Sequence, residues 1–491
     1  MADVTLEPPG AEAGAAAANR IQDGLWSPAR RTLTLGLVLT ITLVAFEALA
    51  VSTIMPNVAR ELGDVALYGW VFTAFFLGSL LGIVFVGGLI DRGGLVRPFI
   101  AGLALFSVGL VIGGLAPSMS VLVAARFLQG LGGGAIPPIA YVSIGRALPE
   151  SLRPRMFATM STAWVLPGVI GPALSGVVAE NVGWRAVFLG LLPLILLAGA
   201  MTLPAMAASI PAADHGPGNA LAATRQRFPA AVLVAFGAGL VVTGLGIATL
   251  LPGVPLIAGV PLIIGGLLIG IPAFRRLTPP GTLSVAAGLP AAVLLRGLLT
   301  FAFFCADVYV PRALVDGRGL SVSVAGIALT AATLAWTGGA WVQARRFTRW
   351  GARRFVRLGY LTVALGILGF AAVLSPDVPV IVGIVTWGIA GFGMGLAYSP
   401  LSLTVLAEAP LAEQGSATSG LILSDVVGTA LGTGIGGAII AAAITAGWPG
   451  WAGFAGAFAV GVGAALFGAL LAVRLPGPRA APARGSEGPL R

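Results

Sequence analysis

Fourteen long apolar segments, separated by short polar or Pro/Gly-rich breaks, constrain the fold of this 491-residue chain more than any other feature. A helix needs about 20 mostly apolar residues to cross the hydrocarbon core of a bilayer. Because the core holds no water to satisfy backbone polar groups, such segments must be helical. The sequence therefore predicts an all-α polytopic membrane protein. The predicted spans lie near residues 33–56, 67–90, 98–116, 119–144, 157–180, 186–206, 229–250, 253–274, 289–311, 320–342, 357–375, 378–403, 415–443 and 450–473.

Composition excludes several other classes of protein. Hydrophobic residues make up 57% of the chain and charged residues 9%, against about 45–50% and about 25% in soluble proteins. All 28 basic residues are arginine, so no lysine is available for a Walker A loop or a Schiff base. His215 and Cys305 are single residues of their type, which excludes an internal disulfide and a His/Cys metal site. We therefore expect no enzyme, no metal and no cofactor.

The distribution of arginine predicts the topology. Cytoplasmic loops of membrane proteins carry the excess of positive charge. With the N-terminus inside, the predicted cytoplasmic segments hold 22 of the 28 arginines. The net charge of +10 therefore reflects loop asymmetry and not a nucleic-acid partner. Both termini are predicted to be cytoplasmic, and twelve spans remain possible only if 229–274 is re-entrant.

The breaks between spans also predict a division into parts. Six spans precede an interior stretch without a span, and eight follow it. The predicted parts are a cytoplasmic tail (1–32), a six-helix half (33–206), a cytoplasmic linker (207–228), two inserted helices (229–274), a second six-helix half (275–474) and a second tail (475–491).

A short cytoplasmic loop after the second span carries small residues, a carboxylate and two arginines. Its residues are Gly87, Asp91, Arg92, Gly94 and Arg97. Small residues let helix ends approach, while charged residues can interact with the helix dipoles. The pattern resembles the loop of the major facilitator superfamily that controls its conformational switch, although two apolar residues replace basic ones. An ordinary cytoplasmic turn is the alternative.

The fourth and fifth spans strengthen this resemblance. Arg126-Phe-Leu-Gln129-Gly130 is similar to the fourth-helix motif of the proton-driven members of the superfamily. The fifth span resembles the antiporter motif of the same superfamily through Gly168, Gly171, Pro172 and Gly176. The resemblance implies two six-helix halves that work by alternating access.

Fourteen spans resemble the EmrB/QacA-type multidrug:proton antiporters within this superfamily. That group carries a carboxylate nine residues before a proline in its first span, and here Glu47 precedes Pro56 by nine. The usual residue is aspartate, so the resemblance implies proton coupling at Glu47 with a longer side chain. The cargo implied is a lipophilic or amphipathic drug-like compound.

The depths of Glu47 and Arg126 support the same role without the family. By helical rise, Glu47 lies roughly 13 Å and Arg126 roughly 10 Å from the predicted outer ends of their spans. A carboxylate at that depth is costly when charged and is usually functional. We expect the two side chains to form a pair, and a purely structural ion pair is the alternative.

Two further carboxylates lie within predicted spans. Asp425 lies about 15 Å into its span, where a structural hydrogen bond across helices and a proton or cation site are the two alternatives. Asp307 and Arg296 share one helix face but are roughly 16 Å apart, so they cannot pair. We expect Asp307 to be solvated beside Arg312 and rank it below Glu47 as a proton-coupling residue.

Several aromatic residues are candidates for the wall of a substrate cavity. They are Trp70, Phe304, Trp336, Trp387 and Tyr398. Aromatic residues in spans more often pack against neighbouring helices or lie at the membrane interface, which is the alternative for each.

The sequence thus predicts a secondary active transporter in the plasma (inner) membrane that exports lipophilic compounds in exchange for protons. Its expected partners are a small-molecule substrate, protons and the lipid bilayer, with the monomer as the working unit. Export of an endogenous lipid or metabolite, and import of a solute, are alternatives with the same fold. A passive channel is disfavoured because the antiporter motif has no role in a static pore.

Overall fold

The structure is a computed structural model, and every regular element in the residues that it describes is helical. Thirteen of the described helices are long and apolar enough to cross a membrane. Helix α8 corresponds to the remaining predicted span and is described over 17 residues. The structure describes residues 24–28, 30–93, 95–149, 152, 155–156, 159–160, 163–209, 219–251, 253–410 and 414–477.

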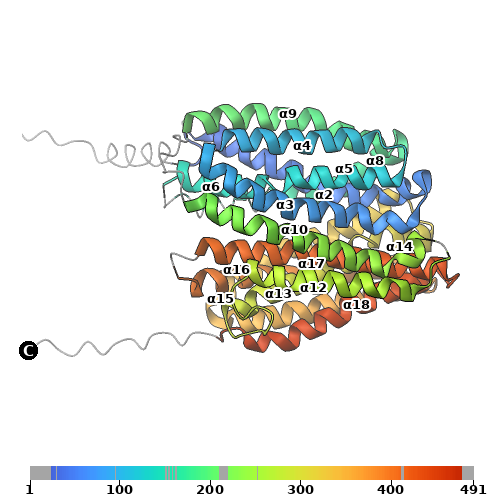
Figure 1. The fold of residues 1–491 in the computed structure, drawn as a ribbon. Coiled ribbons are helices and arrows are strands. Elements are labelled where there is room, and N and C mark those ends of the chain that lie inside the picture. The colour runs from blue at the N-terminus through green and yellow to red at the C-terminus, as the bar shows by residue number, and fades with distance from the viewer. Residues whose placement is uncertain are drawn as a thin grey trace, which may run out of the picture.

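The first group of helices forms one side of the bundle, coloured blue to green in Figure 1. Helix α5 packs against α3 and α4, while α2 packs against α8 and α9. The helices of this half are α2 (Arg31–Leu62), α3 (Tyr68–Gly93), α4 (Val96–Gly114), α5 (Met119–Gly133), α6 (Ile136–Ala147), α8 (Val165–Asn181) and α9 (Trp184–Ser209).

The last group forms the other side, coloured yellow to red. Helix α13 packs against α16, α17 and α18, while α15 packs against α16 and α18. The helices of this half are α13 (Leu289–Asp307), α14 (Val310–Arg318), α15 (Val322–Ala371), α16 (Val380–Glu408), α17 (Gln414–Thr445) and α18 (Gly450–Leu471).

Helices α10 (Asn219–Leu245) and α12 (Val260–Leu277), with the short α11 (Ile247–Leu250) between them, form a hairpin. Its two long helices meet at glycines, where a Cβ on Gly237 would lie 2.6 Å from the carbonyl oxygen of Gly266. Helix α10 contacts α3 of the first half and α17 of the second. Small apolar residues of α10 form a separate buried cluster there with residues of α3, α12 and α17. The hairpin therefore covers one boundary between the two halves.

Local backbone chemistry explains where helices break. The predicted span 119–144 is divided between α5 and α6 because two prolines, Pro137 and Pro138, follow the glycine-rich end of α5. The predicted spans 320–342 and 357–375 both lie in α15, which consists of two helices that meet at a kink. The direction changes there at Gly351, whose φ of 70° lies in the region that favours glycine.

The two halves meet at one end of the bundle, which we call the closed end. On one boundary the rings of Tyr68 and Tyr309 have centroids 5.7 Å apart. Close by, the hydroxyls of Thr73 and Thr433 are 3.2 Å apart. On the other boundary Glu180 accepts hydrogen bonds from the backbone N–H and the hydroxyl of Ser323, at 2.9 and 2.8 Å. The arginine distribution predicts that this end faces outside.

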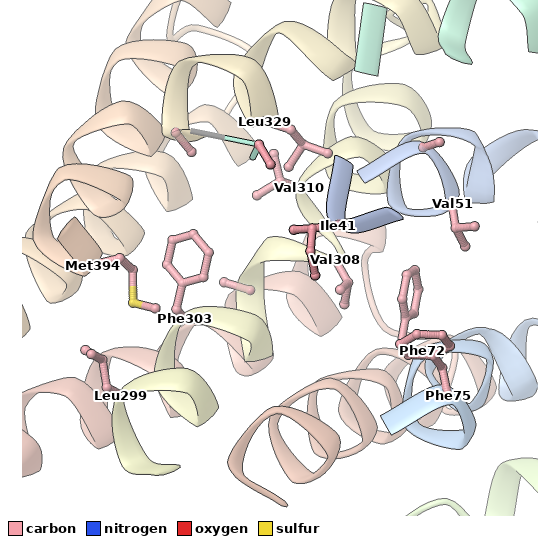
Figure 2. Close-up of a cluster of buried hydrophobic side chains, with 14 of the residues drawn as sticks. Ile41, Val51, Phe72, Phe75, Leu299, Phe303, Val308, Val310, Leu329 and Met394 are labelled. Carbon is pink, nitrogen blue, oxygen red and sulfur yellow. The ribbon is translucent and has the colours of Figure 1, made fainter. Parts of the chain in front are cut away.

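A buried apolar cluster lies between the halves, as Figure 2 shows. Ile41 and Phe72 come from the first half, and Val308, Val310 and Leu329 from the second. All five are buried. The cluster therefore packs the two halves against each other in this state.

Candidate functional site

Glu47 and Arg126 form a buried ion pair inside the first half, as their matched depths predicted. Arg126 Nη1 donates to Glu47 Oε1, and the two side chains are 3% and 0% exposed. The guanidinium also lies 4.2 Å from the ring centroid of Phe75. Its Nε donates to the carbonyl oxygen of Val71 at 3.3 Å. Helices α2, α3 and α5 thus position one charge pair in a buried site.

Gln129 completes this cluster and was not predicted as a site residue. Its Oε1 accepts from Arg126 Nη1 at 2.6 Å, and its Nε2 donates to Glu47 Oε1 at 3.2 Å. Gln129 follows Arg126 by three residues on α5, and residues at that spacing are neighbours on a helix surface. That spacing is a signal from which the sequence could have identified it.

A second charge cluster lies in the other half. Arg296 Nε is 3.4 Å from Asp425 Oδ2, and the hydroxyl of Tyr398 donates to the same oxygen at 2.8 Å. Arg296 Nη1 donates to the carbonyl oxygen of Tyr398 at 2.6 Å and to the hydroxyl of Ser402 at 3.2 Å. Helices α13, α16 and α17 therefore bring together Arg296 and Asp425, a pairing that the sequence did not predict.

Asp307 occupies a different environment from the one expected. It is only 8% exposed, and its Oδ1 accepts from the indole N–H of Trp387 at 3.2 Å. Arg312 pairs instead with Asp316, at 3.1 Å between Nε and Oδ2. The expectation of a solvated Asp307 beside Arg312 is therefore wrong, because the carboxylate at the end of α13 is buried against α16.

The predicted aromatic residues do not form one continuous wall. Trp387 is fully buried and stacks on Phe303, with ring centroids 5.2 Å apart, so no ligand can contact it in this state. Trp336 and Tyr398 are half-buried and meet edge to face at 5.4 Å. Phe304, also half-buried, faces Phe76 across the halves. Trp336, Tyr398 and Phe304 remain the candidates for ligand contact.

Trp70 is the remaining predicted aromatic residue. It is half-buried on α3 beside Gly239 of the hairpin helix α10. It therefore packs against the covered boundary between the halves.

The residues of the antiporter motif lie on α8 and face two directions. Gly168, Pro172 and Gly176 pack against α15 at Thr333, Gly326 and Ser323, respectively. Gly171 faces Phe46 of α2 instead. Side chains larger than hydrogen at Gly168 and Gly176 would collide with α15, so these two glycines allow the halves to meet.

The predicted switch loop lies largely outside the described residues. Asp91 and Arg92 belong to the last turn of α3, but their side chains are not among those described. The surroundings of Gly87 are likewise not described, and Gly94 lies outside the described residues. Arg97 is exposed in the first turn of α4.

A family model described as "Major Facilitator Superfamily" matches residues 37–433. The chain belongs to this superfamily. It is therefore a membrane transporter of small molecules and not an enzyme, and its multi-pass helical bundle is the fold of that superfamily. Within the described residues, no group of three His, Cys, Asp or Glu side chains is placed to hold a metal ion.

The relatives of this chain include proteins named for multidrug efflux or multidrug resistance. The chain is 27% identical over 417 residues to a "Probable multidrug-efflux transporter" of Mycobacterium tuberculosis, covering 82% of this chain and 85% of that protein. It is also 33% identical over 156 residues to "Multidrug resistance protein 3" of Bacillus subtilis, covering 32% of this chain and 30% of that protein.

Solved structures share the fold. The POT family transporter PepTSo superposes with a TM-score of 0.65 at 15% identity, covering 90% of this chain and 97% of that one. The xylose transporter XylE of E. coli, in a partially occluded inward open conformation, gives a TM-score of 0.60 at 12% identity, covering 89% and 97%. At these identities the comparison concerns the fold alone.

Proposed function

We propose that this secondary transporter exports lipophilic or cationic amphipathic compounds in exchange for protons. The observation that carries the proposal is the buried pair of Glu47 and Arg126. Intramembrane ionisable groups are costly, and in transporters they mark proton and substrate pathways. Relatives named for multidrug efflux over most of their length support the choice of cargo.

Protonation of Glu47 is the proposed coupling step. A proton that arrives from outside neutralises the carboxylate and weakens its attraction to Arg126, so the equilibrium between inward- and outward-facing states changes. Asp425 pairs with Arg296 in the other half and is the second proposed proton site. Asp307, held by a neutral donor, ranks third.

In the proposed orientation both termini lie in the cytoplasm, and the closed end of the bundle faces the outside of the cell. It is supported by the arginine distribution. We propose that the monomer is the working unit, with halves at 33–206 and 275–474 and inserted helices at 229–274. The loop from Gly87 to Arg97 is the proposed conformational switch, and Trp336, Tyr398 and Phe304 are the proposed substrate contacts.

Replacement of Glu47 with glutamine tests the coupling role. Glu47→Gln should abolish drug-dependent proton release from acid-loaded everted vesicles, because glutamine keeps the shape and hydrogen bonding of glutamate but cannot change charge. Binding of drug to the purified protein should persist. Glu47→Asp should retain part of the activity, since a carboxylate is still present.

Equal amounts of each variant in the membrane provide the control for insertion. Full proton-coupled export in Glu47→Gln would contradict the assignment. Asp425→Asn should then show the loss instead. Wild-type vesicles that release no protons with any lipophilic drug would contradict proton-coupled drug export itself.

A further inference from the structure

We propose that Gln129 is a positioning residue that holds Arg126 whenever Glu47 is protonated, and that the proton binds at Oε2 of Glu47. This inference rests on the proposed coupling at Glu47. It concerns a residue that contacts both members of the pair and is itself fully buried.

The two oxygens of Glu47 have different surroundings. Oε1 accepts from both Arg126 and Gln129. Oε2 is buried and has no hydrogen-bond partner among the described residues. Burying a polar atom without a hydrogen-bond partner costs free energy. A proton bound at Oε2 removes the negative charge of the carboxylate at that atom. Oε2 is therefore the oxygen with free capacity for the incoming proton.

Arg126 needs a partner after that proton has bound. A neutral carboxyl attracts a guanidinium far less than a carboxylate does, and a buried charge that loses its partner is strongly destabilising. Arginine keeps its charge in proteins, so it cannot respond by releasing a proton. The protonated state of Glu47 is accessible only if other acceptors stabilise Arg126.

Three groups supply this stabilisation. Gln129 Oε1 is 2.6 Å from Nη1 of Arg126, and the carbonyl oxygen of Val71 is 3.3 Å from Nε. The ring of Phe75 faces the guanidinium at 4.2 Å. Gln129 makes the shortest of these contacts and binds the same nitrogen that Glu47 binds. When Glu47 is protonated, Gln129 can therefore remain the acceptor for Nη1 of Arg126 without movement of α5.

Several other charged side chains near α2 are engaged at the closed end. Arg185 of α9 pairs with Glu61, and Arg312 of α14 pairs with Asp316. Glu180 of α8 caps α15 through Ser323. Among the described residues, Arg126 of α5 is the charged side chain that contacts Glu47. The pH dependence of the pair should therefore respond directly to Gln129, the neutral polar side chain that contacts both of its members.

Two substitutions with opposite expected effects test the inference in everted vesicles. The measurement is the pH midpoint of drug-dependent proton release. Gln129→Met removes the acceptor from Arg126, so protonation of Glu47 should require about tenfold more protons and the midpoint should move to lower pH. The donor bond to Glu47 is also lost, but at 3.2 Å it is the longer contact.

Gln129→Glu should move the midpoint the other way. The introduced carboxylate binds Arg126 more strongly and repels the charge of Glu47, so Glu47 should bind its proton at a higher pH. The matched control is Gln343→Met on α15. Gln343 is another buried glutamine, 3% exposed, and its change should leave the midpoint where it is in the wild type.

Opposite shifts in the two Gln129 variants, with an unshifted control, would support the inference. Shifts in the same direction, or none, would overturn it while leaving proton coupling intact. Should Gln129→Met fail to insert, an unshifted midpoint in Gln129→Glu would overturn it alone. Absence of drug-dependent proton release in the wild type would overturn the proposed function, and the role of Gln129 with it.

Discussion

Replacement of Gly176 with alanine should open the closed end of the bundle. A Cβ at this position would lie 2.7 Å from Cα and 2.9 Å from the backbone nitrogen of Ser323. Carbon atoms pack favourably at about 3.5–4.0 Å, so α8 and α15 must separate by about 1 Å. The bonds from Ser323 to Glu180, now 2.9 and 2.8 Å, would then exceed hydrogen-bond length.

The expected effect is a shift of the conformational equilibrium. Overpacking of this kind costs about 1–3 kcal/mol. The cost applies to the closed end and disappears when α8 and α15 move apart. A difference of that size changes the ratio of closed to open molecules by about 5- to 150-fold.

Spin labels on cysteines at Val182 and Val324 can measure this ratio by pulsed electron paramagnetic resonance. Both valines are exposed and flank the contact between Glu180 and Ser323. The native Cys305 is buried and should not take up label. Gly190→Ala on α9 is the matched control, because its Cβ meets nothing within 4 Å. If Gly176→Ala gives the same distance distribution as Gly190→Ala, the steric reasoning is refuted.

Two further predictions concern stability, measured by thermal unfolding of the purified protein. Trp387→Phe keeps a ring beside Phe303 but leaves Asp307 buried without its donor, and should lower the free energy of unfolding by about 1–3 kcal/mol. An unchanged melting temperature, relative to the exposed Trp451→Phe, would contradict this. Glu408→Ala removes the carboxylate that accepts from the N–H of Leu289 at 2.6 Å and should cost about 1 kcal/mol. Glu408→Gln should cost less, because its amide oxygen can still accept, and equal losses in the two variants would contradict the capping role.

The sequence predicts those features of the fold and site that depend only on the length and rise of single helices. Apolar length predicted the transmembrane helices, and helical rise predicted that Glu47 and Arg126 lie at one depth. The structure confirms the pair. The spacing of Arg126 and Gln129 is equally visible in the sequence, but a neutral glutamine gives no charge signal that would mark it as a site residue.

Contacts among three helices were beyond the sequence. The pairing of Arg296 with Asp425 depends on how α13, α16 and α17 pack, and no periodicity within one helix specifies that packing. The burial of Asp307 depends likewise on where Trp387 lies. The kink of α15 at Gly351 depends on the backbone angles of one residue, which the sequence does not reveal.

Both deep ion pairs have their two partners in the same half. Neither pair therefore links one half to the other, and rotation of the halves does not require either pair to separate. Among the described residues, the ion pair that crosses between the halves joins Arg60 and Asp316 at 4.0 Å, and its side chains are 57% and 38% exposed. Water can replace such a contact at little cost. The electrostatic barrier to interconversion is therefore low, and its rate should be governed by separation of the apolar surfaces between the halves and depend only weakly on ionic strength.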